Sequence, residues 1–187
     1  MYSFCNNSIV YLFDILGLAE IITDMKNGYT YWIPTDCCKE QPKRYESLNK
    51  VVSNALPGAN DAYSSDDCWV KHVPKKDVQG RKSYGKIKIQ TNDNRYRWIH
   101  GGGSGLGDKS QDDMQTLLPT FGCTRMHNKD VRELATLLDD EKKRNPGKKI
   151  PYNRKYYKKG SQPEKYTNCL KKYDKCNAKK HQIKCKK

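Results

Sequence analysis

The 187-residue chain lacks the usual signatures of a bound metal or nucleotide. No two of its cysteines have CxxC spacing, so a zinc ribbon is not expected, and the histidines and acids do not add a usable set of ligands. The glycine-rich stretch 101–107 is not followed by the GK[ST] of a phosphate loop. We therefore expect no metal and no cofactor, and the chemistry has to come from the side chains of the chain itself.

A membrane-spanning segment and a recognisable signal peptide are also missing. Residues 8–22 are apolar-rich, but Asp14 interrupts them and the run is too short to cross a bilayer. No basic segment precedes this run, and no small-residue cleavage site follows it. Its apolar residues recur at helical spacing instead, which predicts a packed helix within an N-terminal segment, 1–28. These residues are Ile9, Leu12, Phe13 and Leu16.

Apolar residues make up only 35% of the chain, and three phenylalanines stand against 13 tyrosines, so we expect a modest core built partly from aromatic rings. Short alternating or aromatic runs predict strands at 29–33, 68–73, 85–90 and 95–99. The polar run 37–45 indicates a loop, and 47–56 a short helix. A longer helix is predicted from an N-cap at Asn128 to about Lys143, with a stripe of leucines and a valine on one face and a stop at 145–147.

Acidic residues are scarce in the last quarter of the chain. Residues 141–187 hold 18 Lys and Arg against three acids, so this quarter carries the whole net charge of +15. Tyrosines alternate with these lysines, a mixture that can bind anionic polymers. We therefore treat 146–187 as a basic extension, for which an anionic wall polymer, an acidic membrane surface or nucleic acid are possible partners, and a solvated tail is the simpler alternative.

Cysteine is plentiful, with eight residues in the chain. If one is a nucleophile, seven remain, and disulfides in an oxidising compartment would leave at least one of them unpaired. Cys37 and Cys38 are neighbours, so they point to different partners if both form disulfides.

The most informative stretch joins a histidine to a cysteine. His100 is followed by three glycines, and Cys123 stands between Gly122 and the nearby Arg125. A cysteine attacks a carbonyl as a thiolate, and an imidazole can take the thiol proton and return one to the leaving amine. Backbone N–H groups beside the cysteine could hold the developing oxyanion. A buried inert cysteine and a hydrogen-bonded histidine would give the same spacing, so the pair alone does not distinguish a catalytic site from a structural one.

The complete string is more specific. Ile99, His100 and Gly101 are followed by TFGCTRM and N-x-D-V, and this resembles the catalytic motif of the YkuD-type L,D-transpeptidases. Three features depart from that pattern. Phe121 stands where many members have a second histidine, Gly102 replaces a Thr or Ser, and the loop between the two halves is longer. The matching residues after the loop are Thr120, Gly122, Cys123, Arg125, Met126, Asn128, Asp130 and Val131.

The resemblance implies a mainly β fold, a YkuD-like β-sandwich or barrel with a few helices, here over 29–145. It implies that Cys123 attacks a peptidoglycan stem peptide, that His100 is the base, and that the Gly101 carbonyl orients the imidazole. Arg125, Gly122 and Thr120 would line the substrate site, with Arg125 shaping it or holding a substrate carboxylate. Such an enzyme works in the periplasm or cell envelope, so export is expected although no signal peptide is visible.

Several functions stay open. Resolution of the thioester by an amine gives L,D-transpeptidation, whereas resolution by water gives L,D-carboxypeptidase activity or a wall-degrading toxin. The alternative from another class is a non-catalytic cationic module that binds wall polymer or nucleic acid through residues 141–187. For a catalytic domain, nucleic acid is not the expected partner.

Overall fold

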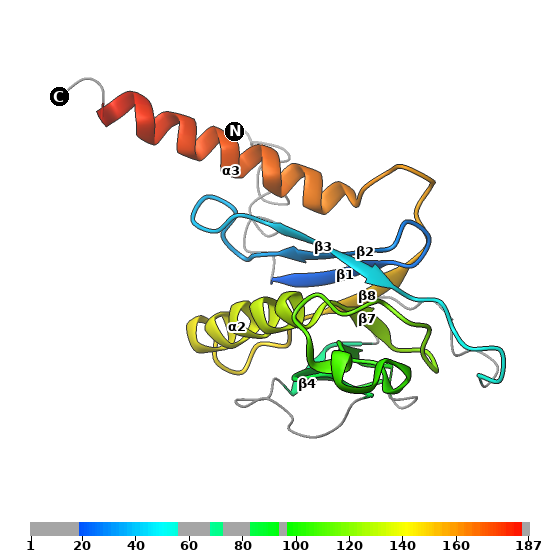
Figure 1. The fold of residues 1–187 in the computed structure, drawn as a ribbon. Helices are drawn as coiled ribbons and strands as arrows, with labels where there is room; N and C mark the ends of the chain where they lie inside the picture. The colour runs from blue at the N-terminus through cyan, green and yellow to red at the C-terminus, as the bar shows by residue number, and fades with distance from the viewer. Residues whose placement is uncertain (1–18, 56–67, 73–82, 94–96, 185–187) are drawn as a thin grey trace, which may run out of the picture.

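The computed structural model describes residues 19–55, 68–72, 83–93 and 97–184 (Figure 1). Most of the predicted helix at 8–22 lies outside these residues. The described residues form one mixed sheet of eight strands, in the order β4-β5-β6-β7-β3-β2-β1-β8, together with two α-helices and one 3₁₀ helix. The expectation of a mainly β fold is therefore confirmed. The strands are β1 (Glu20–Asp24), β2 (Tyr29–Ile33), β3 (Lys43–Leu48), β4 (Val70–His72), β5 (Lys88–Thr91), β6 (Ile99–His100), β7 (Thr124–Met126) and β8 (Tyr152–Lys155).

The sheet curls until its two ends meet. The Val70 N–H donates to the Ile150 carbonyl and the Tyr152 N–H donates to the Cys68 carbonyl, both at 2.9 Å, so β4 is bonded to the chain that enters β8. Closing a sheet in this way removes its exposed edges. β8 in turn pairs with β1 in parallel. The sheet thus includes strands from both sides of the 29–145 segment that the sequence suggested.

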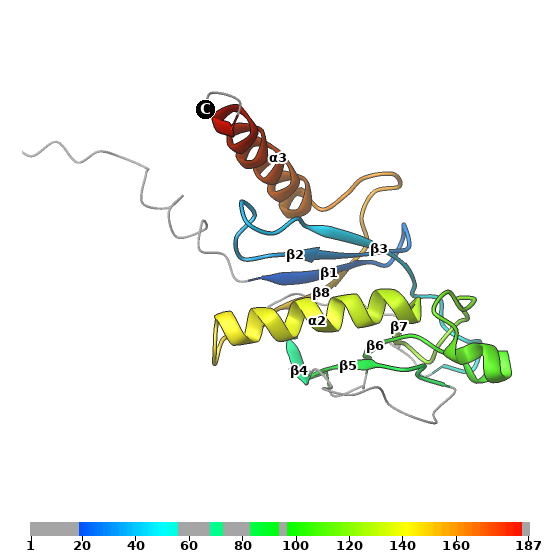
Figure 2. The same cartoon turned by 60° about the vertical axis from the view of Figure 1, so that its left-hand side comes forward.

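Helix α2 (Asn128–Arg144) fills the space between the two halves of the curled sheet. Figures 1 and 2 both show it between the half that contains β1, β2, β3 and β8 and the half that contains β4 to β7. Its stripe of Val131, Leu134 and Leu138 is buried, with Leu137 packed against the same core, as the spacing predicted. The other members of this core include Ile21, Trp32, Ile89, Ile99 and Met126.

Helix α3 (Glu164–Lys184) lies on the opposite face of β1 and β2 (Figures 1 and 2). Tyr166 and Cys169 pack there against Tyr31 and its neighbours, forming a second, smaller core. Two disulfides, Cys37–Cys169 and Cys38–Cys176, hold the helix to the loop after β2. None of the helices in the described part of the chain is long and apolar enough to cross a membrane.

Some predicted elements were wrong or shifted. The segment 47–56 is not a helix, because Ser47 and Leu48 end β3 and a turn follows at 53–54. The predicted loop 37–45 gives way to β3 from Lys43, and the last three residues of the predicted 8–22 helix lie in β1. In each of these places, pairing with a neighbouring strand overrides the local preference. The strand at 29–33 is confirmed. Among the described residues, the predicted strand 68–73 contains β4, the strand 85–90 overlaps β5, and the strand 95–99 ends at the first residue of β6. Residues 73, 95 and 96 of these predictions lie outside the described part of the chain.

Candidate active site

The histidine singled out by the sequence lies on β6, and the cysteine immediately precedes the neighbouring strand, β7. β6 and β7 run parallel, with Ile99 opposite Thr124 and His100 opposite Arg125. Ile99 belongs to the core inside the curled sheet, so the alternation of side chains along a strand sends His100 and Arg125 to the other face. Cys123 comes immediately before β7 and two residues before Arg125, so the alternation of the strand, if it is continued by one residue, would bring its side chain to the same face as His100.

His100 is oriented by the next residue in the chain. Its Nδ1–H donates to the Gly101 carbonyl oxygen at 2.7 Å, which leaves Nε2 as the proton acceptor of the neutral ring. The ring is buried, and its burial, together with the charges of Arg125 and Lys88, lowers the pKa of His100 to about 3. The imidazole is therefore neutral at physiological pH and available as a base.

Cys123 is half-buried at the end of the loop before β7. Burial raises the pKa of its thiol, while the backbone N–H of Trp98 and the charges of Arg154 and Arg125 act in the opposite direction. The net effect is upward, so the thiol keeps its proton in the resting protein. A nucleophilic role would then require transfer of that proton to a base during the attack.

Thr120 and Gly122 shape the loop that carries the cysteine. The Thr120 hydroxyl donates to the Cys123 carbonyl at 2.7 Å and accepts the Gly122 N–H at 3.1 Å. Gly122 has φ +122°, a conformation that side chains with a Cβ rarely adopt, so the turn into Cys123 requires glycine. The Thr120 hydroxyl and the Gly122 N–H thus form hydrogen bonds within the loop, and these bonds fix the position of the thiol.

Arg125 holds the glycine turn after the histidine. Its Nη1 donates to the Gly101 carbonyl at 3.3 Å and to the Gly102 carbonyl, and its side chain is buried. No carboxylate of the described residues forms an ion pair with it. The Gly101 carbonyl thus accepts bonds from both His100 and Arg125, which ties the base to the strand of the cysteine.

Asn128 fastens the loop that follows the glycines. It is the first residue of α2 and not its N-cap as predicted; His127 occupies the cap without a side-chain bond. The Asn128 amide donates to the carbonyls of Ser110 and Asp112 at 2.9 and 2.6 Å. The loop after the glycines contains a 3₁₀ helix, Ser104–Gln111, and is bonded to the start of α2 through these two hydrogen bonds.

Four residues near His100 or Cys123 were not predicted from the sequence. Tyr84 packs edge-on against the His100 ring, and Lys88 lies over the rings of Tyr84 and Trp98. The charge of the buried Arg154 of β8 acts against the rise in the pKa of Cys123. The alternation of isoleucines and lysines at 86–89 did place Lys88 on the face away from the core. No local pattern in the sequence indicates which strand pairs with β5. Nor does one indicate where the basic extension re-enters the sheet.

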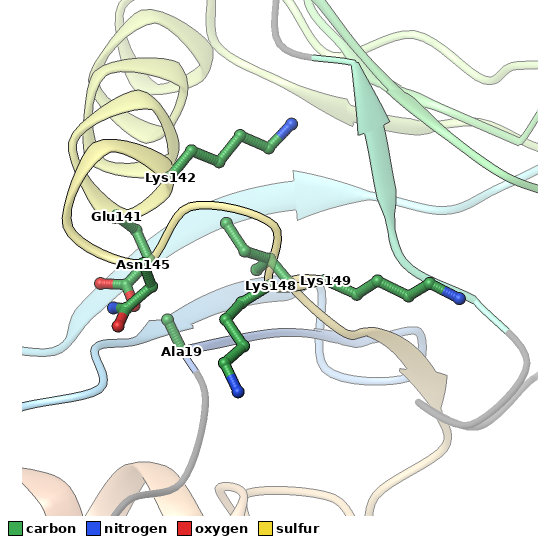
Figure 3. A pocket seen from close by; sticks show the side chains of 7 residues that line it. Ala19, Glu141, Lys142, Asn145, Lys148 and Lys149 are labelled. Carbon is green, nitrogen blue, oxygen red and sulfur yellow. The ribbon is translucent and has the colours of Figure 1, made fainter.

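Two hollows in the described part of the molecule lie away from this pair. A narrow cleft with about 170 Å³ of empty space is found at the end of α2, lined by Ala19, Glu141, Lys142, Asn145, Lys148, Lys149 and Ile150 (Figure 3). This cleft and the cysteine loop lie at opposite ends of α2, whose rise of about 1.5 Å per residue puts roughly 20 Å between them. A wider groove with about 780 Å³ of empty space lies between the start of β3 and α3, where Lys43, Arg44 and Tyr166 line it. Neither hollow includes the histidine or the cysteine.

Comparison with known proteins places the chain in a family. The family model YkuD, described as the L,D-transpeptidase catalytic domain, matches residues 17–151. This range includes both halves of the motif and strands β1 to β7. No curated protein matches the chain.

Proposed function

The chain belongs to the YkuD family of L,D-transpeptidase catalytic domains, and we propose that it is a cysteine acyltransferase acting on peptidoglycan stem peptides. The chemistry of this family is acyl transfer on peptidoglycan in the cell envelope. In the proposal, Cys123 is the nucleophile and His100 is the base. The same reasoning suggests export to the envelope as the site of action.

One observation carries the proposal. Cys123 and His100 come from the two halves of the family motif, and the parallel pairing of β6 and β7 brings the segments that carry them side by side. The Gly101 carbonyl takes the Nδ1 proton of His100, so its Nε2 can accept the thiol proton. An inert core cysteine would need neither an oriented neutral imidazole nor a turn built from Gly122.

The first step follows from these positions. The sulfur of Cys123 attacks the carbonyl carbon that joins the diamino acid to the terminal D-alanine, and its proton moves to Nε2 of His100. The C–N bond then breaks, and the imidazole returns the proton to the departing nitrogen. D-alanine leaves and the acyl group remains on Cys123 as a thioester. Arg125 keeps its place in the glycine turn and holds the imidazole's carbonyl partner in position.

The second step decides between the activities of this fold. Attack by an amine on the thioester forms a cross-link, which is L,D-transpeptidation, and attack by water gives an L,D-carboxypeptidase or a wall-degrading toxin. Phe121, two residues before Cys123, occupies the position where a histidine is common in the family, and it is 68% exposed. This altered and accessible position is the reason that hydrolysis remains one of the two proposed outcomes.

The decisive test removes the sulfur. We expect Cys123→Ala to abolish D-alanine release from a purified tetrapeptide, and wild-type protein trapped with the peptide to carry the acyl mass on the Cys123 peptide. Cys68→Ala is the matched control, because Cys68 is the other described cysteine outside a disulfide and lies in the core. Release that survives Cys123→Ala would refute the proposed nucleophile.

A non-catalytic function has its own support. The groove beside α3 is lined by Lys43 and Arg44, and the helix adds exposed Lys171, Lys172 and Lys175, which suits an anionic wall polymer. If polymer binding is the whole function, Cys123→Ala leaves it unchanged, and a chain without α3 loses it. Binding to wall polymer at two salt concentrations measures this, since attraction between exposed charges is screened by salt.

A further inference from the structure

Three positive or titratable side chains stand in one row across the site. Lys88 on β5 is the direct partner of His100 on β6, and His100 is the direct partner of Arg125 on β7. Figure 2 shows these strands side by side at the lower edge of the molecule. Direct partners in neighbouring strands share one face of the sheet, so the imidazole lies between a lysine and an arginine.

Lys88 is held in place by aromatic rings. Its Nζ lies 4.6 Å from the centre of the Trp98 ring and 5.1 Å from that of Tyr84. The Tyr84 ring meets the His100 ring edge-on at 5.0 Å, so the lysine and the base share one aromatic support. Within the described part of the chain no carboxylate forms an ion pair with Lys88. A half-buried ammonium in this setting attracts an anion from outside.

The order of the row matches the order of atoms in the scissile part of the substrate. The attacked carbonyl belongs at Cys123, beside β7, and the departing nitrogen belongs at His100, on β6. In a terminal amino acid the carboxylate carbon is two bonds beyond that nitrogen, in the direction of the next strand, β5. Neighbouring strands are about 4.8 Å apart, a span that the lysine side chain can adjust.

We propose that Lys88 binds the carboxylate of the leaving amino acid, so that the site selects a terminal residue with a free carboxylate. This inference rests on the proposed function and names one subsite of it. The lysine forms an ion pair only; the bonds that form and break are those of the acylation step, and the amino acid departs with its carboxylate intact.

The charges around the imidazole support this assignment. Arg125 and Lys88 both oppose protonation of His100, so the base would receive the thiol proton in a positive field. A carboxylate bound at Lys88 neutralises part of that field. The substrate would thereby ease the transfer of the proton from Cys123, and an uncharged leaving group would not.

The test compares two leaving groups. A tetrapeptide ending in D-alanine and the same peptide ending in D-alaninamide are incubated with each variant, and release of the last residue is measured by mass spectrometry. We expect wild-type kcat/KM to favour the free carboxylate by about tenfold, the usual scale for losing a charge-assisted bond. Lys88→Met should lose this preference through a slower reaction of the acid, and Lys88→Arg should retain it. Lys71→Met, which changes an exposed lysine on β4, should behave like wild type.

A second measurement does not depend on the peptide. Alkylation of Cys123 by anionic iodoacetate and by neutral iodoacetamide is followed on the Cys123 peptide. Lys88→Met should lower the iodoacetate rate several-fold relative to iodoacetamide. An unchanged ratio, or equal slowing of both tetrapeptides, would overturn the subsite. A changed ratio in a protein that releases nothing from either peptide would support the subsite and refute the proposed reaction.

Discussion

At the scale of the residue, the pair of Cys123 and His100 is neutral at rest. Burial raises the pKa of the thiol, and burial with two neighbouring cations lowers the pKa of the imidazole. A preformed thiolate–imidazolium pair is therefore disfavoured, and the proposed reaction transfers the proton as the sulfur attacks. Such a site protects the thiol from unwanted reactions until the substrate is bound.

This arrangement has a measurable effect on stability. The folded pKa of His100, about 3, is below the unfolded value near 6.5, so below pH 6.5 the unfolded chain takes up a proton that the folded protein refuses. The free energy of unfolding should therefore fall as the pH falls, by about 2 kcal/mol between pH 7 and pH 5 from this group alone. Urea unfolding of wild type and His100→Gln at both pH values checks this. Equal losses in the two proteins would contradict it.

The motif identified the residues of the candidate site but not their surroundings. His100, Gly101, Cys123 and Arg125 follow from the string, since the motif fixes their types and order. The position of Lys88 does not follow from the string, because its place beside His100 depends on the pairing of β5 with β6. A lysine on the outer face of a strand has the same local pattern whether it is solvated or part of a site.

At the scale of the element, the start of α2 and the glycine loop act as one unit. A Cβ at Gly101 would overlap Oδ1 of Asn128 and lie 2.8 Å from its Cγ. The same Asn128 amide binds the carbonyls of Ser110 and Asp112, so it cannot move aside without breaking those bonds. The close approach of helix and loop thus requires both the glycine and the asparagine.

A double-mutant cycle measures this coupling. Gly101→Ala should destabilise by about 1–3 kcal/mol through overpacking, and Asn128→Ala by a similar amount through its lost bonds. The double variant should lose less than the sum by at least about 0.5 kcal/mol, because an alanine in place of Asn128 leaves room for the new methyl group. Thermal or urea unfolding of the four proteins gives the values. Strict additivity would show that helix and loop are independent.

At the scale of the whole molecule, the last strand belongs to the catalytic sheet. Tyr152 of β8 bridges the sheet: its hydroxyl contacts the Thr124 hydroxyl at 2.7 Å and the Thr23 hydroxyl at 3.1 Å, and all three residues are buried. Thr124 is the neighbour of Cys123, so closure of the sheet also supports the strand that follows the proposed nucleophile. We therefore propose a catalytic domain from β1 to β8, with α3 as an appended helix.

Two truncations test this division. A chain ending at residue 145 removes β8 and should not unfold cooperatively, because β1, β4 and Thr124 lose their partners. A chain ending at residue 161, with Cys37→Ser and Cys38→Ser, should unfold cooperatively at a reduced temperature and keep D-alanine release. Full-length protein with the same two serines is the control. Calorimetry and the release assay give the readouts, and a folded 1–145 chain would refute the assignment of β8.

The sequence by itself determined the family motif, the residue types of the pair and the apolar stripe of α2, because each is written in local spacing. The mainly β class followed from the resemblance to the YkuD family. Only the tertiary structure decided that 47–48 are strand, that β8 closes the sheet, and that Lys88 stands beside His100. These features depend on which distant strands pair, and hydrogen bonding between segments far apart in the chain leaves no periodic trace in either segment alone.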